Sequence, residues 1–69
     1  FVALKKLRLE LARERSVPAF AVFSDKTLIQ MVNDMPTTQD DFLAINGVGR
    51  MKLEKFYHPF QELISKFRP

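Results

Sequence analysis

The sequence predicts an all-α fold, a compact bundle of about five short helices with an extended apolar connector after the first. Apolar residues recur at helical spacing in several stretches, and prolines or an Asn-Gly pair separate these stretches. The chain has 69 residues, 46% of them apolar, which is enough for one small core. We therefore expect a single domain over residues 1–69. Because the chain starts at Phe1 within a helical pattern, we expect it to be a fragment of a larger protein.

The first helix is expected over about the first fifteen residues, where Leu4, Leu7 and Leu11 recur on one face. The opposite face is mainly basic but also holds two apolar residues. Those two either contact another part of the parent protein or are tolerated at the surface. The residues of this outer face are Val2, Lys5, Lys6, Leu9 and Arg13.

An apolar segment, SVPAFAVF (residues 16–23), follows the first helix. Pro18 ends the helical pattern, and the segment is too short and too close to the next helix to be a paired strand. We expect an extended connector whose side chains alternate, so that Phe20 and Val22 face one way and Phe23 the other. One aromatic ring should then remain partly exposed.

A second helix is expected after Ser24, which is a good N-cap residue. Asp25 falls in its first turn, where the helix dipole favours a negative charge. Pro36 ends this helix. Its apolar stripe is expected to comprise Leu28, Met31, Val32 and Met35.

A third helix is expected to start at Thr37 or Thr38 as the cap. The Asp40–Asp41 pair occupies its first turn, and adjacent residues on a helix point about 100° apart. The pair therefore suits a helix start better than a shared catalytic site. Asn46 and Gly47 end the helix, because both tolerate the left-handed conformation. Its apolar residues are Phe42, Leu43 and Ile45.

Two more helices are expected at the end of the chain. The fourth runs from about Gly49 to Tyr57, and Pro59 begins the fifth at its first position. The fourth should bury Leu53 and Phe56. The apolar stripe of the fifth should comprise Phe60, Leu63, Ile64 and Phe67.

The net charge of +3 is unevenly distributed along the chain. Residues 1–24 hold five basic and two acidic side chains, and residues 42–69 hold the same numbers, giving +3 each. Residues 25–41 hold one basic and four acidic side chains, giving −3. This pattern is consistent with one positive face that attracts a polyanion, or with ordinary solvated charges.

No group of residues has the composition of a catalytic or metal site. There is no Cys and no Walker-type loop, and His58 is the only histidine. The serines Ser16, Ser24 and Ser65 have no base at a plausible spacing. We therefore expect a non-catalytic, monomeric domain without cofactor, metal or membrane. The lack of Cys fits a reducing compartment, so we expect a cytoplasmic location.

Two segments could contact nucleic acid. In NGVG (residues 46–49), the glycines and the following helix start could receive a phosphate, with Arg50, Lys52 and Lys55 adding charge. Alternatively, Gly47 only permits a turn and Gly49 only allows close helix packing. In PAFAVF, Phe20 could stack on a base beside basic side chains, or both Phe residues of the segment could be core residues.

The whole chain resembles the HRDC domain, the helicase-and-RNase-D C-terminal module. The elements that carry the resemblance are LRxxLAxExxVPxFxVFxDxTL, then MP, then INGVGxxKLEKFxxPF. The version found in bacterial RecQ DNA helicases is the most similar. The resemblance implies a helical bundle that assists its parent helicase, in the bacterial nucleoid, in DNA repair and recombination.

The resemblance also implies a partner and a site. RecQ-type HRDC domains favour single-stranded or partly single-stranded DNA, and an aromatic residue in the connector is part of the contact. That position is Phe20 here, where the family often has Tyr. The expected nucleic-acid-binding residues are Phe20, Lys26, Arg50, Lys52 and Lys55. Two alternatives remain: docking on the helicase core or a partner, through the acidic middle and the outer face of the first helix, and RNA binding of the RNase D type.

Overall fold

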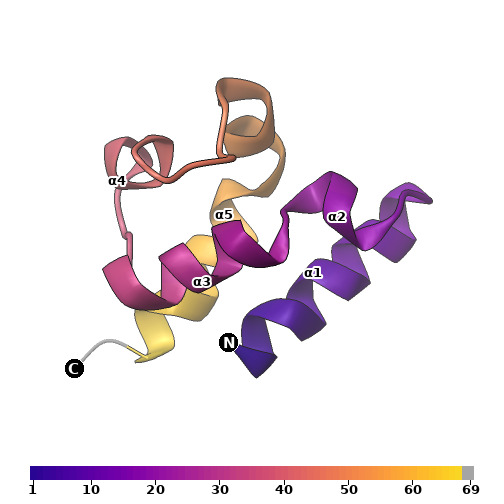
Figure 1. Ribbon diagram of the computed structural model, residues 1–69, viewed down its shortest axis with the longest axis horizontal. Helices are drawn as coiled ribbons and strands as arrows, with labels where there is room; N and C mark the ends of the chain where they lie inside the picture. The colour runs from indigo at the N-terminus through magenta and orange to yellow at the C-terminus, as the bar shows by residue number, and fades with distance from the viewer. Residues whose placement is uncertain (68–69) are drawn as a thin grey trace.

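The structure, a computed structural model, describes residues 1–67, which form five helices and no strand. The helices are α1 (Val2–Arg15), α2 (Ala19–Val22), α3 (Asp25–Asp34), α4 (Gln39–Leu43) and α5 (Arg50–Phe67). In Figure 1, α1 and α4 lie on opposite sides of the molecule, with α3 and α5 between them. α1 packs on α2, α3 and α5, and α4 packs on α5. The predicted all-α bundle is confirmed.

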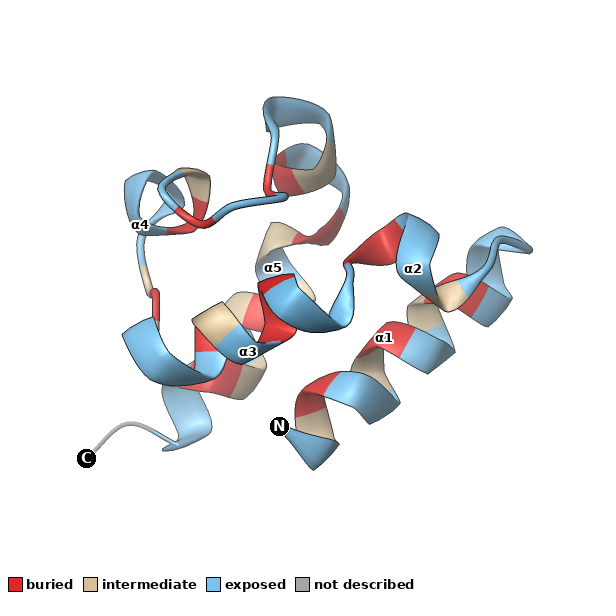
Figure 2. Ribbon diagram, in the orientation of Figure 1, coloured by how far each residue is buried: buried red, intermediate tan, exposed pale blue. Residues whose placement is uncertain are grey.

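The core lies where the five helices face one another. Figure 2 shows buried positions on the inner sides of the helices and exposed positions on their outer sides. Phe23, Phe42 and Phe60 are among the fully buried side chains. Val32 and Phe67 were predicted on core stripes but are exposed. Val32 lies about 100° around α3 from the buried Met31, and Phe67 is the last residue of α5.

The segment after Pro18 is a single helical turn, so the prediction of an extended connector is wrong. Pro18 is the N-cap of α2 and has an extended conformation, and its carbonyl accepts a hydrogen bond from Ala21 N–H at 3.0 Å. Residues two apart on a helix point about 200° apart. Phe20 therefore faces solvent while Val22 is buried, where alternation in a strand would place both on one side.

The last two predicted helices are one continuous helix, α5, with Pro59 in its interior. An interior proline removes one backbone hydrogen bond and costs about 3 kcal/mol, which is why the sequence suggested a break. The buried residues on the two sides of Pro59 share one stripe and pack into the same core, which offsets that cost. These residues are Leu53, Phe56, Phe60 and Ile64.

The predicted caps of α3 and α4 are confirmed. Ser24 Oγ accepts a hydrogen bond from Thr27 N–H at 3.2 Å at the start of α3. Thr38, and not Thr37, caps α4: its Oγ1 accepts from Asp41 N–H at 3.1 Å. The carboxylate of Asp41 accepts from Thr38 N–H in return, so this acidic residue belongs to a capping box.

Candidate nucleic-acid interface

Phe20 is an exposed aromatic residue on the short helix α2. Its side chain is 72% exposed, whereas Val22 and Phe23 are 0% and 2% exposed. A large ring in solvent next to two buried apolar residues is unfavourable for a residue whose only task is packing. The sequence-based prediction that one ring of this segment stays exposed is confirmed, although the reason is the helical turn and not alternation in an extended chain.

A buried arginine on α1 fixes the end of the segment that carries Phe20. Arg8 Nη1 donates a hydrogen bond to the carbonyl oxygen of Phe23 at 2.9 Å. The same nitrogen lies 2.7 Å from Asp25 Oδ1, in the first turn of α3. One guanidinium thus joins α1 to the junction between α2 and α3, so Phe20 projects from a fixed turn.

Two cations lie over the aromatic cluster that Phe23, at the end of α2, forms with two rings of α5. The ring of Phe23 packs edge-on against Phe56 and Phe60, with centroid distances of 5.7 and 5.1 Å. Lys52 Nζ lies 5.8 Å from the centroid of Phe23, and Arg15 Cζ lies 4.9 Å from that of Phe56. Both distances are within the range of cation–π attraction, which orients these cations at the surface.

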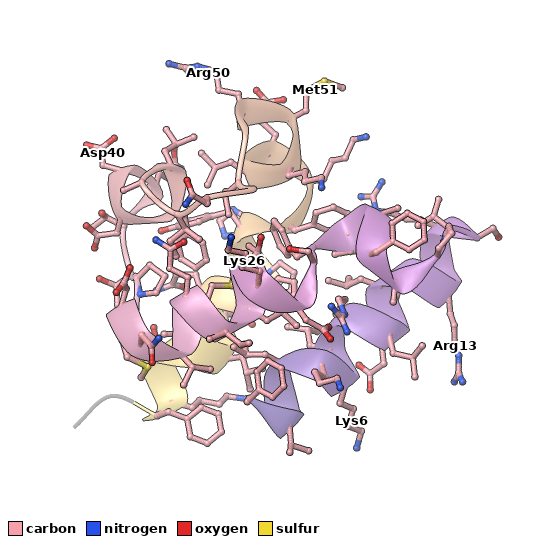
Figure 3. All side chains as sticks on the ribbon, in the orientation of Figure 1. Lys6, Arg13, Lys26, Asp40, Arg50 and Met51 are labelled. Atoms are coloured by element: carbon pink, nitrogen blue, oxygen red, sulfur yellow. The ribbon has the colours of Figure 1, made fainter. Side chains whose placement is uncertain are left out.

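The other predicted basic residues are more dispersed. Lys26 lies in the first turn of α3, and Arg50 is the first residue of α5. In Figure 3, Arg50 points away from the body of the protein at the start of α5, while Lys26 projects from α3. Lys55 is exposed further along α5. Of the predicted cations, Lys52 contacts an aromatic ring of the α2 segment, that of Phe23, which is the C-cap of α2.

Sequence reasoning missed Arg15 as a member of this surface. Arg15 is the last residue of α1, and its partner Phe56 lies on α5, far away in the sequence. The contact has no periodic signal along the chain. The only hint in the sequence was the basic composition of residues 1–24.

The NGVG segment forms the turn that leads into α5. Gly47 has a φ of +92°, and a Cβ there would collide with Thr27 Oγ1, which donates a hydrogen bond to Asn46 O at 2.8 Å. Gly47 therefore serves the turn. By contrast, no atom lies within 4 Å of where a Cβ of Gly49 would be, so Gly49 does not allow close helix packing as one interpretation proposed.

The remaining candidate groups have structural roles or none. His58 is exposed, and its ring packs edge-on against Tyr57 at 5.3 Å. Within residues 1–67, no group of three or more His, Cys, Asp or Glu side chains could hold a metal ion. Across the same residues, no helix is both long and apolar enough to cross a membrane.

Comparison with known proteins gives the family. The family model of the HRDC domain matches residues 1–64. The chain belongs to the HRDC domain family. The resemblance found in the sequence is therefore confirmed, including its similarity to the bacterial RecQ type.

The relatives of this HRDC domain are much longer proteins. An ATP-dependent DNA helicase RecQ from Pasteurella multocida is 43% identical over 68 residues, which cover 99% of this chain and 11% of that protein. RecQ from Bacillus subtilis is 40% identical over 67 residues, covering 97% of this chain and 11% of the helicase. UvrD2, an ATP-dependent DNA helicase from Mycobacterium tuberculosis, is 41% identical over 61 residues, covering 88% and 9%. The chain therefore spans about a tenth of the length of these helicases.

Proposed function

We propose that this HRDC domain is a non-catalytic accessory module of a RecQ-type DNA helicase, and that it binds single-stranded or partly single-stranded DNA weakly. The observation that supports this best is the exposed ring of Phe20, which projects from a turn whose end Arg8 fixes at Phe23. Lys52 lies over the ring of Phe23, at the end of the same segment. In this proposal a base stacks on Phe20 while phosphates contact basic side chains. Base–aromatic stacking contributes about 1–3 kcal/mol per base.

The positions of three basic residues support a phosphate contact. Lys26 lies in the first turn of α3, and Arg50 and Lys52 lie in the first turn of α5. The helix dipole is positive there, so a cation in a first turn is disfavoured by about 0.3–1 kcal/mol. A bound phosphate would reverse that penalty, because it interacts favourably with the dipole and with the side chain.

The direct test is the affinity of Phe20→Ala for a fluorescein-labelled oligothymidylate, measured by fluorescence anisotropy. We expect a loss of about 5- to 150-fold, which corresponds to the stacking energy of one base. Phe67→Ala is the matched control and should leave the affinity unchanged. Phe67 is also exposed, at 62%, but it is the last residue of α5, whereas Arg50 and Lys52 lie at the start of that helix. Equal affinity of wild-type protein and Phe20→Ala for the oligonucleotide would rule out the stacking role.

The contribution of the basic side chains is tested by measuring how the affinity for the same oligonucleotide depends on salt concentration. For single strands, the logarithm of affinity falls with the logarithm of salt concentration by about 0.7 per phosphate neutralised. Lys52→Glu should therefore lower affinity at low salt and make this slope shallower. Arg15→Glu should do the same. An oligouridylate of equal length, titrated in parallel, separates a DNA-binding domain from one that prefers RNA.

The proposed function also includes where the domain acts and in what oligomeric state. The bacterial relatives are DNA helicases, so we place the domain in the bacterial cytoplasm, at the nucleoid, as a monomer within its helicase. Contact with the helicase core is a second role that this setting allows. The DNA contact requires no cofactor and no metal.

A further inference from the structure

The outer face of α1 forms a second surface, which the proposed DNA contact does not use. Val2 and Leu9 are 81% and 43% exposed, although both are aliphatic. They border a groove of about 510 Å³ between α1 and the start of α2. Its lining residues are Val2, Lys5, Lys6, Arg8, Leu9 and Ala19.

The charge of this groove is positive. Among residues 1–67, neither Lys5 nor Lys6 takes part in an ion pair, whereas the charge of Arg8 is balanced by Asp25. Lys5 Nζ lies 5.4 Å from the centroid of the Phe1 ring, so its ammonium group is held at the surface near the start of α1. In Figure 3, Lys6 projects outward from α1, away from the body of the protein, and Arg13 does so further along the same helix.

On this groove, two exposed aliphatic side chains, Val2 and Leu9, flank two lysines. Val2 and Leu9 are seven residues apart in the sequence, which is about 10 Å along a helix. Lys5 and Lys6 lie between them in the sequence. Since the pair is aliphatic, it offers apolar anchoring but no ring on which a nucleic-acid base could stack. The groove volume is within the range of ligand-binding pockets in proteins.

We propose that this groove binds a short acidic segment of a partner protein. Apolar side chains of the segment pack on Val2 and Leu9, and its carboxylates contact Lys5 and Lys6. Charge complementarity selects an acidic occupant, and the two aliphatic contacts select one with apolar side chains at both ends. Phe20 does not line this groove, although its neighbour Ala19 does, so the two proposed surfaces meet at the start of α2.

The test uses the 69-residue chain and a synthetic fluorescein-labelled peptide in which two leucines flank a run of glutamates. We expect saturable binding by fluorescence anisotropy, and backbone amide NMR shifts confined to α1 and the start of α2. Two control peptides separate the contributions, one with lysines in place of the glutamates and one with alanines in place of the leucines. Both should bind more weakly.

Variants assign the binding to the groove. Lys6→Glu should lower the affinity for the glutamate peptide roughly tenfold, since like charges across an interface repel. Val2→Ser should weaken it as well, and the high exposure of Val2 makes this change compatible with folding. Lys55→Glu and Phe20→Ala should leave the affinity for the peptide unchanged, even if they lower the affinity for the oligonucleotide.

Three results would overturn the inference: no saturable binding of the glutamate peptide, equal binding of the lysine peptide, or amide shifts outside α1 and α2. A fourth result would assign the groove to DNA. In that result, Lys6→Glu lowers the affinity for the oligonucleotide as much as Phe20→Ala does, and the oligonucleotide also displaces the bound peptide. If the wild-type protein binds the glutamate peptide but not the oligothymidylate, the proposed function is rejected and this inference remains.

Discussion

The guanidinium of Arg8 joins three helices, so its removal should destabilise the fold and loosen the turn that carries Phe20. Arg8 is only 7% exposed, and its Nη1 is the partner of both the Phe23 carbonyl and the Asp25 carboxylate. Replacing it by methionine keeps an unbranched apolar stem of similar length and removes the charged head. The substitution Arg8→Met thus isolates the polar contacts from the packing of the stem.

The expected destabilisation is about 1–3 kcal/mol. Phe23 is 2% exposed, so its carbonyl oxygen would lose a partner in a buried position, which costs about 1–3 kcal/mol. The ion pair adds less than about 1 kcal/mol, because the Asp25 side chain is 62% exposed and water screens it. One term acts in the opposite direction: Arg8 Nε is buried without a hydrogen-bond partner, so its removal relieves a desolvation penalty.

The assay is equilibrium unfolding in urea, followed by circular dichroism. A domain of this size has only ~3–5 kcal/mol of net stability, so the loss should move the urea midpoint far down. Asp25→Asn is the matched variant: it weakens the ion pair but leaves the hydrogen bond from Arg8 to Phe23. It should cost about 1 kcal/mol or less. An Arg8→Met protein that unfolds at the same urea concentration as Asp25→Asn would refute the assignment of stability to the Phe23 carbonyl.

Two further predictions concern the backbone. Gly47→Ala should destabilise the protein by about 2 kcal/mol or more in the same urea assay, because a φ of +92° is strained for alanine and the new Cβ collides with Thr27 Oγ1. Gly49→Ala should change stability by less than about 1 kcal/mol, since open space surrounds that position; equal costs at both glycines would contradict this account. Pro59→Ala should raise the melting temperature in calorimetry by roughly 5 °C or more, because it restores a backbone hydrogen bond within α5. A lower melting temperature would show that the proline ring contributes more to packing than its missing N–H costs.

Local chemistry in the sequence was sufficient to predict α1, α3 and α4. The periodic leucines of α1 and the caps Ser24 and Thr38 are signals that act over a few residues, and the structure confirms them. α2 could not be predicted in this way, because one turn has no periodicity. Its shape depends on the burial of Val22 and Phe23 against distant helices.

The break predicted at Pro59 shows a different limit of sequence reasoning. Proline has a strong local preference, but the apolar stripe of α5 continues in phase from Phe56 to Phe60 across it. That phase was readable in the sequence and favoured one helix. The burial of these two rings against Phe23 outweighs the lost hydrogen bond.

The candidate site was predictable only in part, for the same reason. An exposed ring in residues 16–23 was predicted from alternation in an extended segment, and the structure identifies the ring as Phe20, exposed by a helical turn instead. The two cations over the aromatic cluster come from α1 and α5, and of these only Lys52 was predicted. Arg8 was not singled out, because an arginine on a helix is usually solvated and its burial depends on where α2 and α3 lie.

Three features of this HRDC domain violate the local rules that stabilise a small bundle. Phe20 exposes a ring, Arg50 and Lys52 place positive charge at the positive end of α5, and Val2 exposes an aliphatic side chain beside two lysines. Each has a cost in a domain with little stability to lose, and departures of this kind concentrate at functional surfaces. In the proposed function, a polyanion that also stacks a base would relieve the first two. In the further inference, an acidic segment with apolar side chains would relieve the third. Because the two sets of requirements differ, one ligand would not satisfy both, and this is the physical reason to propose two binding surfaces on one small domain.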